Sequence, residues 1–378
     1  MTQPDPIRQL LAACIPINPQ PWYAKKIQTA ADHINDWSKV PDVAEKHGMA
    51  PLLYFHISAG GIHVPDETLR CLKAQLLRER LIHREQEKSI LELNTFFINN
   101  GIEILFLKGA ALAYLLYPRP ELRPMSDLDF LVSLENIKKT CSLLGEMGYQ
   151  GFPELPDMKT KRHLPFFYKP QNGFTVYVEP HYMLFQDKSS KPWFGIRDLS
   201  IPYLAFQVGE NNQVHCLGHE DMLFHLCQHA FFDNQGLSAY RFIWVADIVN
   251  YAEKYVQEID WERIRRIYPS VIHTLVMLNF ITPITQIVLE KLKIATPIGS
   301  CGDCNDFSGW PVLPIATWKK EGLGRFLKDT FFPSDWWLKM HYGIRTRAPL
   351  WYYWFLHIFV LLEEFLRRCN VRHKKKHP

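Results

Sequence analysis

The sequence predicts an α+β protein in which a small mixed sheet lies between N-terminal and C-terminal helical segments. Up to about residue 100, and again after residue 218, apolar residues recur every three or four positions, as on helices that bury one face. Between these regions, short apolar or alternating segments are bounded by Gly, Pro and Asn, which is typical of strands. With 378 residues, 47% hydrophobic and 22% charged, the chain can bury a sizeable core.

The N-terminal region, residues 1–100, is expected to be helical. Four segments carry the helical spacing of apolar residues: 7–14, 22–37, 43–59 and 66–99. The last and longest ends at Asn99-Asn100-Gly101, residue types that commonly end helices.

A mixed α/β core is expected over residues 101–217. We expect a strand at 103–107, a tight turn at Lys108-Gly109 and a helix at 109–116. The elements predicted after this turn are a strand at 127–133, a helix at 135–147, strands near 149–152, 164–169 and 174–180, and one or two strands between 194 and 216.

Helices return over residues 218–294. The expected helical ranges are 219–231, 240–256, 260–267 and 270–293. The last region, 295–378, starts with a loop at 295–317 that is rich in Pro, Gly and Asp. Ordered pieces are expected at 326–337 and 349–368, with a disordered tail beyond them.

Asp127-Leu128-Asp129, followed by an apolar stretch, is the most informative motif. Side chains alternate faces along a strand, so both carboxylates project to one side while Leu128 and Phe130 point into the core. Carboxylates placed this way are ligands that Mg²⁺ prefers. The alternative is a pair of surface acids on an exposed strand edge.

The turn at Lys108-Gly109 is the second motif. A backbone turn that enters a helix N-terminus can hold a phosphate group. The alternative is that Gly109 is needed only for a positive φ and that the Lys108 side chain is solvated.

Residues 107–132 read LKGAALAYLLYPRPELRPMSDLDFLV. This stretch resembles an uncharacterised bacterial nucleotidyltransferase family of the DNA polymerase β superfamily, with the hallmark LKG…YP…R…SDxDxLV. The resemblance continues through 220–230 and 241–248 and spans about residues 90 to 290. Ala110 departs from the broad superfamily, which usually has Ser or a second Gly there. The gap from Gly109 to Asp127 is longer than in most polymerase β relatives but suits the narrower family.

The resemblance implies a metal-dependent site with Mg²⁺ or Mn²⁺. The implied catalytic and metal-binding residues are Asp127, Asp129 and Glu179, where Glu179-Pro180-His181 fits the family's third acid. Two ions clamp the attacking and leaving oxygens in such sites. The alternative for Glu179 is a strand end in solvent. The implied nucleotide-binding residues are Lys108, Gly109, Ala110 and Arg123. Arg123 either contacts the triphosphate or pairs with a carboxylate.

Several other polar residues are expected to surround the carboxylates. His225 and His229 are four apart on one helix face, a spacing that can bind zinc, but the Glu of metalloproteases is missing. We therefore favour a supporting histidine pair. Asp247 lies among apolar residues and needs a partner, for which His225, His229 and Arg241 are candidates. His181 either orients the acid before it or touches substrate.

The C-terminal region offers two further features. Residues 350–362 are too short to span a membrane, and the aromatic run 351–355 is followed by a basic tail. This segment is either a helix packed on the core or an element on an anionic membrane surface. Cys301 and Cys304 lack a second cysteine pair with zinc-site spacing, so we expect unligated thiols.

The combined features predict a cytoplasmic enzyme that transfers NMP from an NTP to a hydroxyl or phosphate acceptor and releases pyrophosphate. Eight scattered cysteines and the lack of a signal peptide indicate a reducing compartment. The net charge of +4 is concentrated in the tail, which disfavours an extensive nucleic-acid surface. The acceptor is left open among small molecules, peptides and proteins. The alternatives are a non-catalytic nucleotide-binding regulator and a toxin-like tRNA nucleotidyltransferase.

Overall fold

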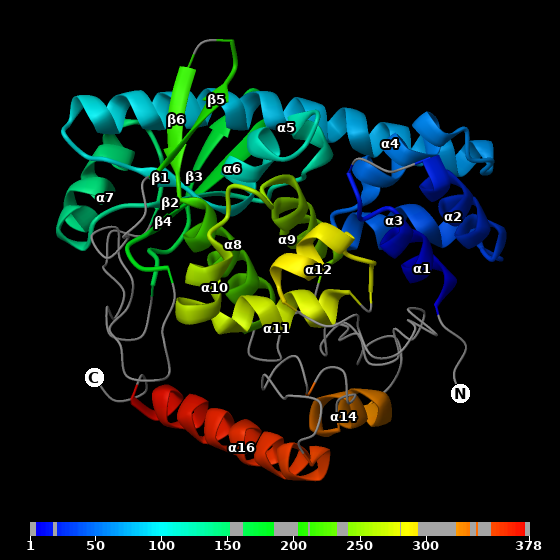
Figure 1. Cartoon of the computed structure of the whole chain (residues 1–378). Coiled ribbons are helices and arrows are strands. Elements are labelled where there is room, and N and C mark those ends of the chain that lie inside the picture. Colours follow the sequence, from blue (N-terminus) through cyan, green and yellow to red (C-terminus); the bar gives the residue numbers. More distant parts are fainter. Residues whose placement is uncertain are drawn as a thin grey trace.

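The computed structural model describes residues 5–17, 21–151, 162–184, 203–210, 212–232, 241–279, 281–293, 323–332, 338 and 349–374. Helices flank a six-stranded mixed sheet (Figure 1). This architecture confirms the predicted α+β class.

The N-terminal helices are α1 (Pro6–Ala13), α2 (Pro21–Asp32), α3 (Val40–Lys46), α4 (Ala50–Gly60) and α5 (Asp66–Asn99). The prediction for 66–99 is confirmed at both ends. The single helix predicted over 43–59 is wrong, because a turn separates α3 from α4. Gly48 has a φ of +70° at this turn, and a Cβ there would lie 2.9 Å from both Arg241 Nη2 and Ile243 Cγ2. The helical spacing of apolar residues continues through this turn, so the sequence pattern does not reveal where α3 ends.

The sheet holds the predicted central strands and two strands in the range 194–216, where one or two were expected. The strands are β1 (Leu105–Phe106), β2 (Leu128–Leu131), β3 (Phe167–Gln171), β4 (Phe174–His181), β5 (Leu204–Val208) and β6 (Asn212–Cys216), in the order β3-β4-β2-β1-β6-β5. β2 pairs parallel with β4, and β1 pairs antiparallel with β2. Helix α6 (Lys108–Leu115) follows β1, and α7 (Ile137–Glu146) follows β2. Of the strand expected near 149–152, the described residues 149–151 form a single bridge between Gln150 and Tyr168 rather than a strand, and residue 152 lies outside the described residues.

The two faces of the sheet differ in character. Leu128 and Phe130 are fully buried on one face, where the Phe130 ring lies 5.6 Å from that of Phe97 in α5. This confirms that both residues point into the core. Because side chains alternate along a strand, Asp129 projects from the opposite face. Helix α5 runs along the sheet and reaches the N-terminal helices at its other end (Figure 1).

The helices after the sheet are α8 (His219–Cys227), a π-helical turn (Gln228–Phe232), α9 (Phe242–Lys254), α10 (Trp261–Ile267), α11 (Pro269–Leu278) and α12 (Gln286–Lys291). The single helix predicted over 270–293 is wrong. After α11, the Asn279 side chain accepts a hydrogen bond from the Ile284 backbone N–H at 2.8 Å. This bond, together with Pro283, turns the chain before α12 begins.

Among the described residues of the C-terminal region, the helices with defined bounds are α14 (Leu323–Phe331) and α16 (Leu350–Lys374). They contact each other where His357 Nε2 lies 2.9 Å from the Thr330 carbonyl oxygen. The prediction of disorder after residue 368 is wrong as far as Lys374, because α16 continues to that residue. The loop expected at 295–317, with Cys301 and Cys304, lies outside the described residues. Within the described residues, no helix combines the length and apolar character needed to cross a membrane.

Candidate active site

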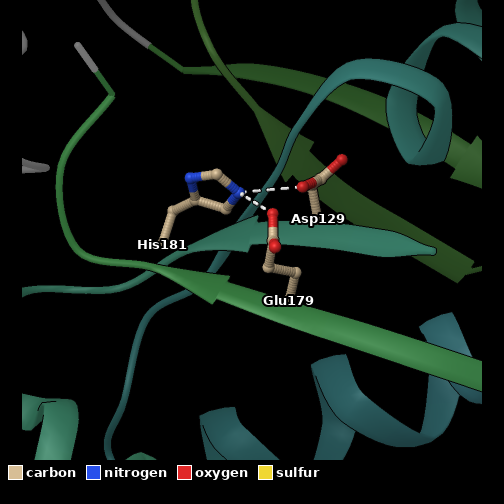
Figure 2. A group of neighbouring side chains, drawn as sticks. All are labelled: Asp129, Glu179 and His181. Atoms are coloured by element: carbon tan, nitrogen blue, oxygen red, sulfur yellow. Dashed lines mark hydrogen bonds and ion pairs between the residues drawn. The ribbon is translucent and has the colours of Figure 1, made fainter. Parts of the chain in front are cut away.

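Asp129, Glu179 and His181 meet on the face of the sheet that points away from α5. His181 Nε2 lies 2.8 Å from Asp129 Oδ1 and 2.9 Å from Glu179 Oε2 (Figure 2). One potential ligand atom from each of the three residues lies within 4.8 Å of the other two, and all three side chains are buried. Two carboxylates and one imidazole are thus held at a spacing that suits a metal ion.

The strand register explains this cluster. Asp129 of β2 pairs directly with Glu179 of β4 in the parallel ladder, so their side chains lie on one face. His181 follows two positions after Glu179 and projects from the same face. The sequence correctly predicted that Asp129 and Glu179 lie together. It assigned His181 only a supporting role beside them.

Lys108 lies against the cluster rather than in solvent. Its Nζ donates to Asp129 Oδ1 at 2.9 Å, and its side chain is largely buried. The positive φ of this turn, +45°, belongs to Lys108 and not to Gly109. A lysine in the left-handed region is strained, and such strain often accompanies function. The solvated alternative for Lys108 is therefore wrong.

Asp127 lies outside this cluster of three. It is partly exposed just before β2, and Ser126 Oγ donates to its Oδ1 at 2.8 Å. Burial, strengthened by the negative charge of Asp129, raises the pKa of Asp127 to about 6. The structure thus groups two of the three predicted acids directly, with Asp127 close enough for their charges to interact.

The charges of the cluster balance one another. Burial alone would raise the pKa of Asp129, but the Lys108 ammonium and the His181 hydrogen bond lower it below its ordinary value. Burial opposes charge on Lys108 and His181 as well, yet the neighbouring carboxylates raise the pKa of both. The site is therefore a compact group of paired opposite charges.

His163 is a site residue that the sequence reasoning missed. Its Nδ1 lies 3.0 Å from Glu179 Oε1, whereas His181 contacts the other carboxylate oxygen, Oε2. Burial raises the pKa of Glu179, but hydrogen bonds from His163 and His181 outweigh it and lower the pKa. An isolated histidine in an irregular segment carries no sequence signal for this contact.

Arg123 and Asp247 form a buried ion pair behind the turn. Arg123 Nη2 donates to Asp247 Oδ2 at 2.6 Å, and Nε lies 3.1 Å from both carboxylate oxygens. Tyr117 donates its hydroxyl to Asp247 Oδ1 at 2.8 Å. The sequence did not suggest Arg123 or Tyr117 as partners of Asp247, whereas its candidate Arg241 does lie close enough for its charge to interact with Asp247. For Arg123, the geometry favours the carboxylate pairing over a contact with the triphosphate.

Gly109 is required by this ion pair. A Cβ at Gly109 would lie 2.8 Å from Arg123 Nη1 and 3.1 Å from Met125 Cγ. The next residue, Ala110, is buried, and its N–H donates to the Leu107 carbonyl at 3.1 Å. The turn therefore packs directly on the Arg123 guanidinium.

Residues 33–271 match the model of a family described as an uncharacterised nucleotidyltransferase. The match covers more than half of the chain. The chain belongs to this nucleotidyltransferase family. Comparisons with curated proteins and with solved structures found no match. The matched region contains every site residue described above and ends before α14 and α16.

The remaining polar residues predicted for this nucleotidyltransferase site are arranged around it. His225 is buried, and neither ring nitrogen has a hydrogen-bond partner among the described residues. Burial, followed by the charge of Lys108, lowers the pKa of His225 and of His229 well below the ordinary value. The His229 ring packs edge-on against Trp244 at 5.0 Å. Arg241 donates from Nε to the Lys46 carbonyl at 3.2 Å.

We expect Gly109→Ala to destabilise the protein by about 1–3 kcal/mol, because the added methyl group overlaps the Arg123 guanidinium. Urea unfolding measures the change. Gly145→Ala in α7 is the matched control, since a Cβ there meets no described atom within 4 Å. Alanine favours helix, so the control should be neutral or more stable by up to about 1 kcal/mol. Equal effects of both substitutions would contradict the close packing at Gly109.

Proposed function

We propose that the protein is a metal-dependent nucleotidyltransferase that transfers NMP from an NTP to a hydroxyl or phosphate acceptor and releases pyrophosphate. The observation that carries this proposal is the convergence of Asp129, Glu179 and His181 on one sheet face beside the Lys108-Gly109 turn. Membership of the family supports nucleotidyl transfer as the reaction class.

The donor set fits a divalent cation. Asp129 and Glu179 supply carboxylate oxygens, which Mg²⁺ and Mn²⁺ prefer, and Asp127 lies at the more exposed side of the pair. The His181 nitrogen suits Mn²⁺ better than Mg²⁺, because Mg²⁺ favours an all-oxygen shell. A bound ion would supply charge neutralisation at the phosphates during transfer.

The surrounding side chains have separate roles in this proposal. His163 and His181 hold the Glu179 carboxylate from two sides. Lys108 compensates the negative charge of Asp129 and lies next to the turn that we assign to the phosphates. Asp127, which is less buried than Asp129 and interacts with its charge, is assigned as a further carboxylate ligand of the ion.

A non-catalytic nucleotide-binding function is the second candidate. One observation favours it: the Lys108 ammonium already donates to the Asp129 oxygen that a cation would take. In that case, a nucleotide would bind and no pyrophosphate would be released.

Incubation of the purified protein with each α-labelled NTP, with and without cell extract, tests the proposal. We expect transfer of label and release of pyrophosphate only when Mg²⁺ or Mn²⁺ is present. NTP binding without label transfer under any of these conditions would contradict catalysis and support the second candidate. Label found only on tRNA would favour the toxin-like alternative.

We also propose a cytoplasmic location and a weak membrane contact through α16. The described cysteines carry free thiols, which a reducing compartment maintains. The residues of the aromatic stripe on α16 are exposed along one side of the helix: Trp351, Tyr352, Phe355, Phe359 and Leu362. Six basic residues follow in the sequence: Arg367, Arg368, Arg372, Lys374, Lys375 and Lys376. Aromatic and basic residues combined in this way suit an anionic membrane surface.

We expect weak flotation of the protein with anionic vesicles. Each basic residue near the surface contributes on the order of 1 kcal/mol, and added salt screens that attraction. Deleting the residues after Leu366 should abolish the binding and leave the fold intact. Salt-resistant binding to neutral vesicles would instead show that the aromatic stripe inserts without help from charge.

A further inference from the structure

Three exposed aromatic side chains form a row at the outer edge of the sheet. Phe166, Tyr168 and Tyr177 are 49%, 39% and 42% exposed. The Tyr177 ring centroid lies 6.4 Å from that of Phe166 and 6.3 Å from that of Tyr168. The Tyr177 ring is inclined by 79° to that of Phe166 and by 41° to that of Tyr168, so each ring offers its own face to a ligand.

This aromatic row, Phe166, Tyr168 and Tyr177, continues the face that carries the carboxylates. Tyr168 pairs directly with Tyr177 across β3 and β4, so their side chains share a face. Tyr177 precedes Glu179 by two positions on β4 and therefore projects to the same side. The alternate residues Phe167, Val176 and Val178 are buried on the opposite face. The rings and the carboxylate cluster are thus parts of one surface.

The sheet order places the aromatic row beyond the carboxylates, on the side away from the Lys108-Gly109 turn. β1, which leads into the Lys108-Gly109 turn, flanks β2 on one side, and β4 followed by β3 flanks it on the other. Crossing the sheet therefore leads from the turn, through Asp129 and Glu179, to the aromatic row. An NTP with its phosphates at the turn would have the rings on the far side of the carboxylates.

We propose that the aromatic row is a stacking platform for the nucleobase of the acceptor, which makes the acceptor a nucleoside or nucleotide. This inference rests on the proposed function and names the acceptor class for the same site. Every nucleobase has a flat π-face, and aromatic side chains stack on it with little regard to sequence. Because the rings are inclined to one another, they suit a single base, and hence a small acceptor better than an extended strand.

Binding of 2-aminopurine riboside, whose fluorescence falls when the base stacks, tests the platform without turnover. We expect saturable quenching by the wild-type protein. Tyr168→Ala should weaken binding about tenfold, within the range measured for removing a stacked aromatic residue. Tyr168→Phe keeps the ring and should bind within about twofold of wild type. Phe355→Ala, which removes an exposed ring from α16, is the control and should have no effect.

The same titration in the presence of an uncleavable NTP analogue, with methylene between the α- and β-phosphorus atoms, identifies which base the platform holds. Unchanged nucleoside affinity would place the acceptor there, as we expect. Competition would show that the NTP base occupies the rings and would overturn the acceptor assignment. Absence of quenching, or equal binding by Tyr168→Ala, would overturn the platform itself. The titration with the analogue is run with Mn²⁺ at an analogue concentration that saturates the protein. The nucleoside titration alone needs neither metal nor transfer, so failure of the proposed function would be seen separately, as an absence of pyrophosphate release.

Discussion

Asp129→Asn is expected to abolish nucleotidyl transfer. The substitution keeps the shape of the side chain but removes the charge that Lys108 and His181 share. Loss of a carboxylate that neutralises and positions a catalytic ion forfeits several kcal/mol of transition-state stabilisation, which is a rate loss of about a thousandfold or more. Pyrophosphate release at saturating NTP and Mn²⁺ measures it.

Glu67→Gln is the matched control for this substitution, because Glu67 is an exposed acid on α5 that pairs with Arg70 at the surface. It should keep wild-type activity. Circular dichroism should show that both variants are folded. A folded Asp129→Asn protein with more than about a tenth of the wild-type rate would contradict the assignment of Asp129.

Asp247→Asn is expected to destabilise the protein by about 3–5 kcal/mol. The pair with Arg123 is buried, and removing the negative charge leaves a guanidinium without compensation in the core. Urea unfolding with an unchanged m-value would measure the loss. Glu67→Gln breaks an exposed pair of the same type and should cost at most about 1 kcal/mol.

The same variant tests whether the ion pair supports the turn. Arg123 packs under Gly109, so release of its guanidinium should disturb the segment that positions Lys108. We expect weaker nucleotide binding by Asp247→Asn at temperatures where it remains folded. A stability loss below about 1 kcal/mol would mean that the pair contributes little and that Tyr117 alone can satisfy Asp247.

Local patterns sufficed for much of the fold and for the two central acids. Strand periodicity predicted that Asp129 projects away from the core, and the resemblance to the nucleotidyltransferase family, together with the strand pattern before it, predicted Glu179. Helix α5 was predicted with its correct ends because Asn99-Asn100-Gly101 is a local stop signal. These features depend on residues that are close in sequence, so they can be recognised from the sequence alone.

The missed features depend on contacts between distant segments. Arg123 and Asp247 are 124 positions apart, and the sequence around each residue does not indicate that the other is its partner. The turn at Gly48 is set by close contact with Arg241 and Ile243 from the start of α9. Likewise, His163 reaches Glu179 through a bridge between His163 and His181 outside the regular strands. Such pairings arise only when the fold brings distant segments together, and they produce no periodic pattern in the local sequence.

The most direct measurement of the central claim is a Mn²⁺ titration of the wild-type protein, followed by the electron paramagnetic resonance signal of free Mn²⁺. Our interpretation of the cluster of Asp129, Glu179 and His181 expects saturable binding by the wild type and by Glu67→Gln, and at least about tenfold weaker binding by Asp129→Asn, since that variant lacks one ligand charge. Equal Mn²⁺ binding by Asp129→Asn and the wild type would contradict a metal site at this cluster.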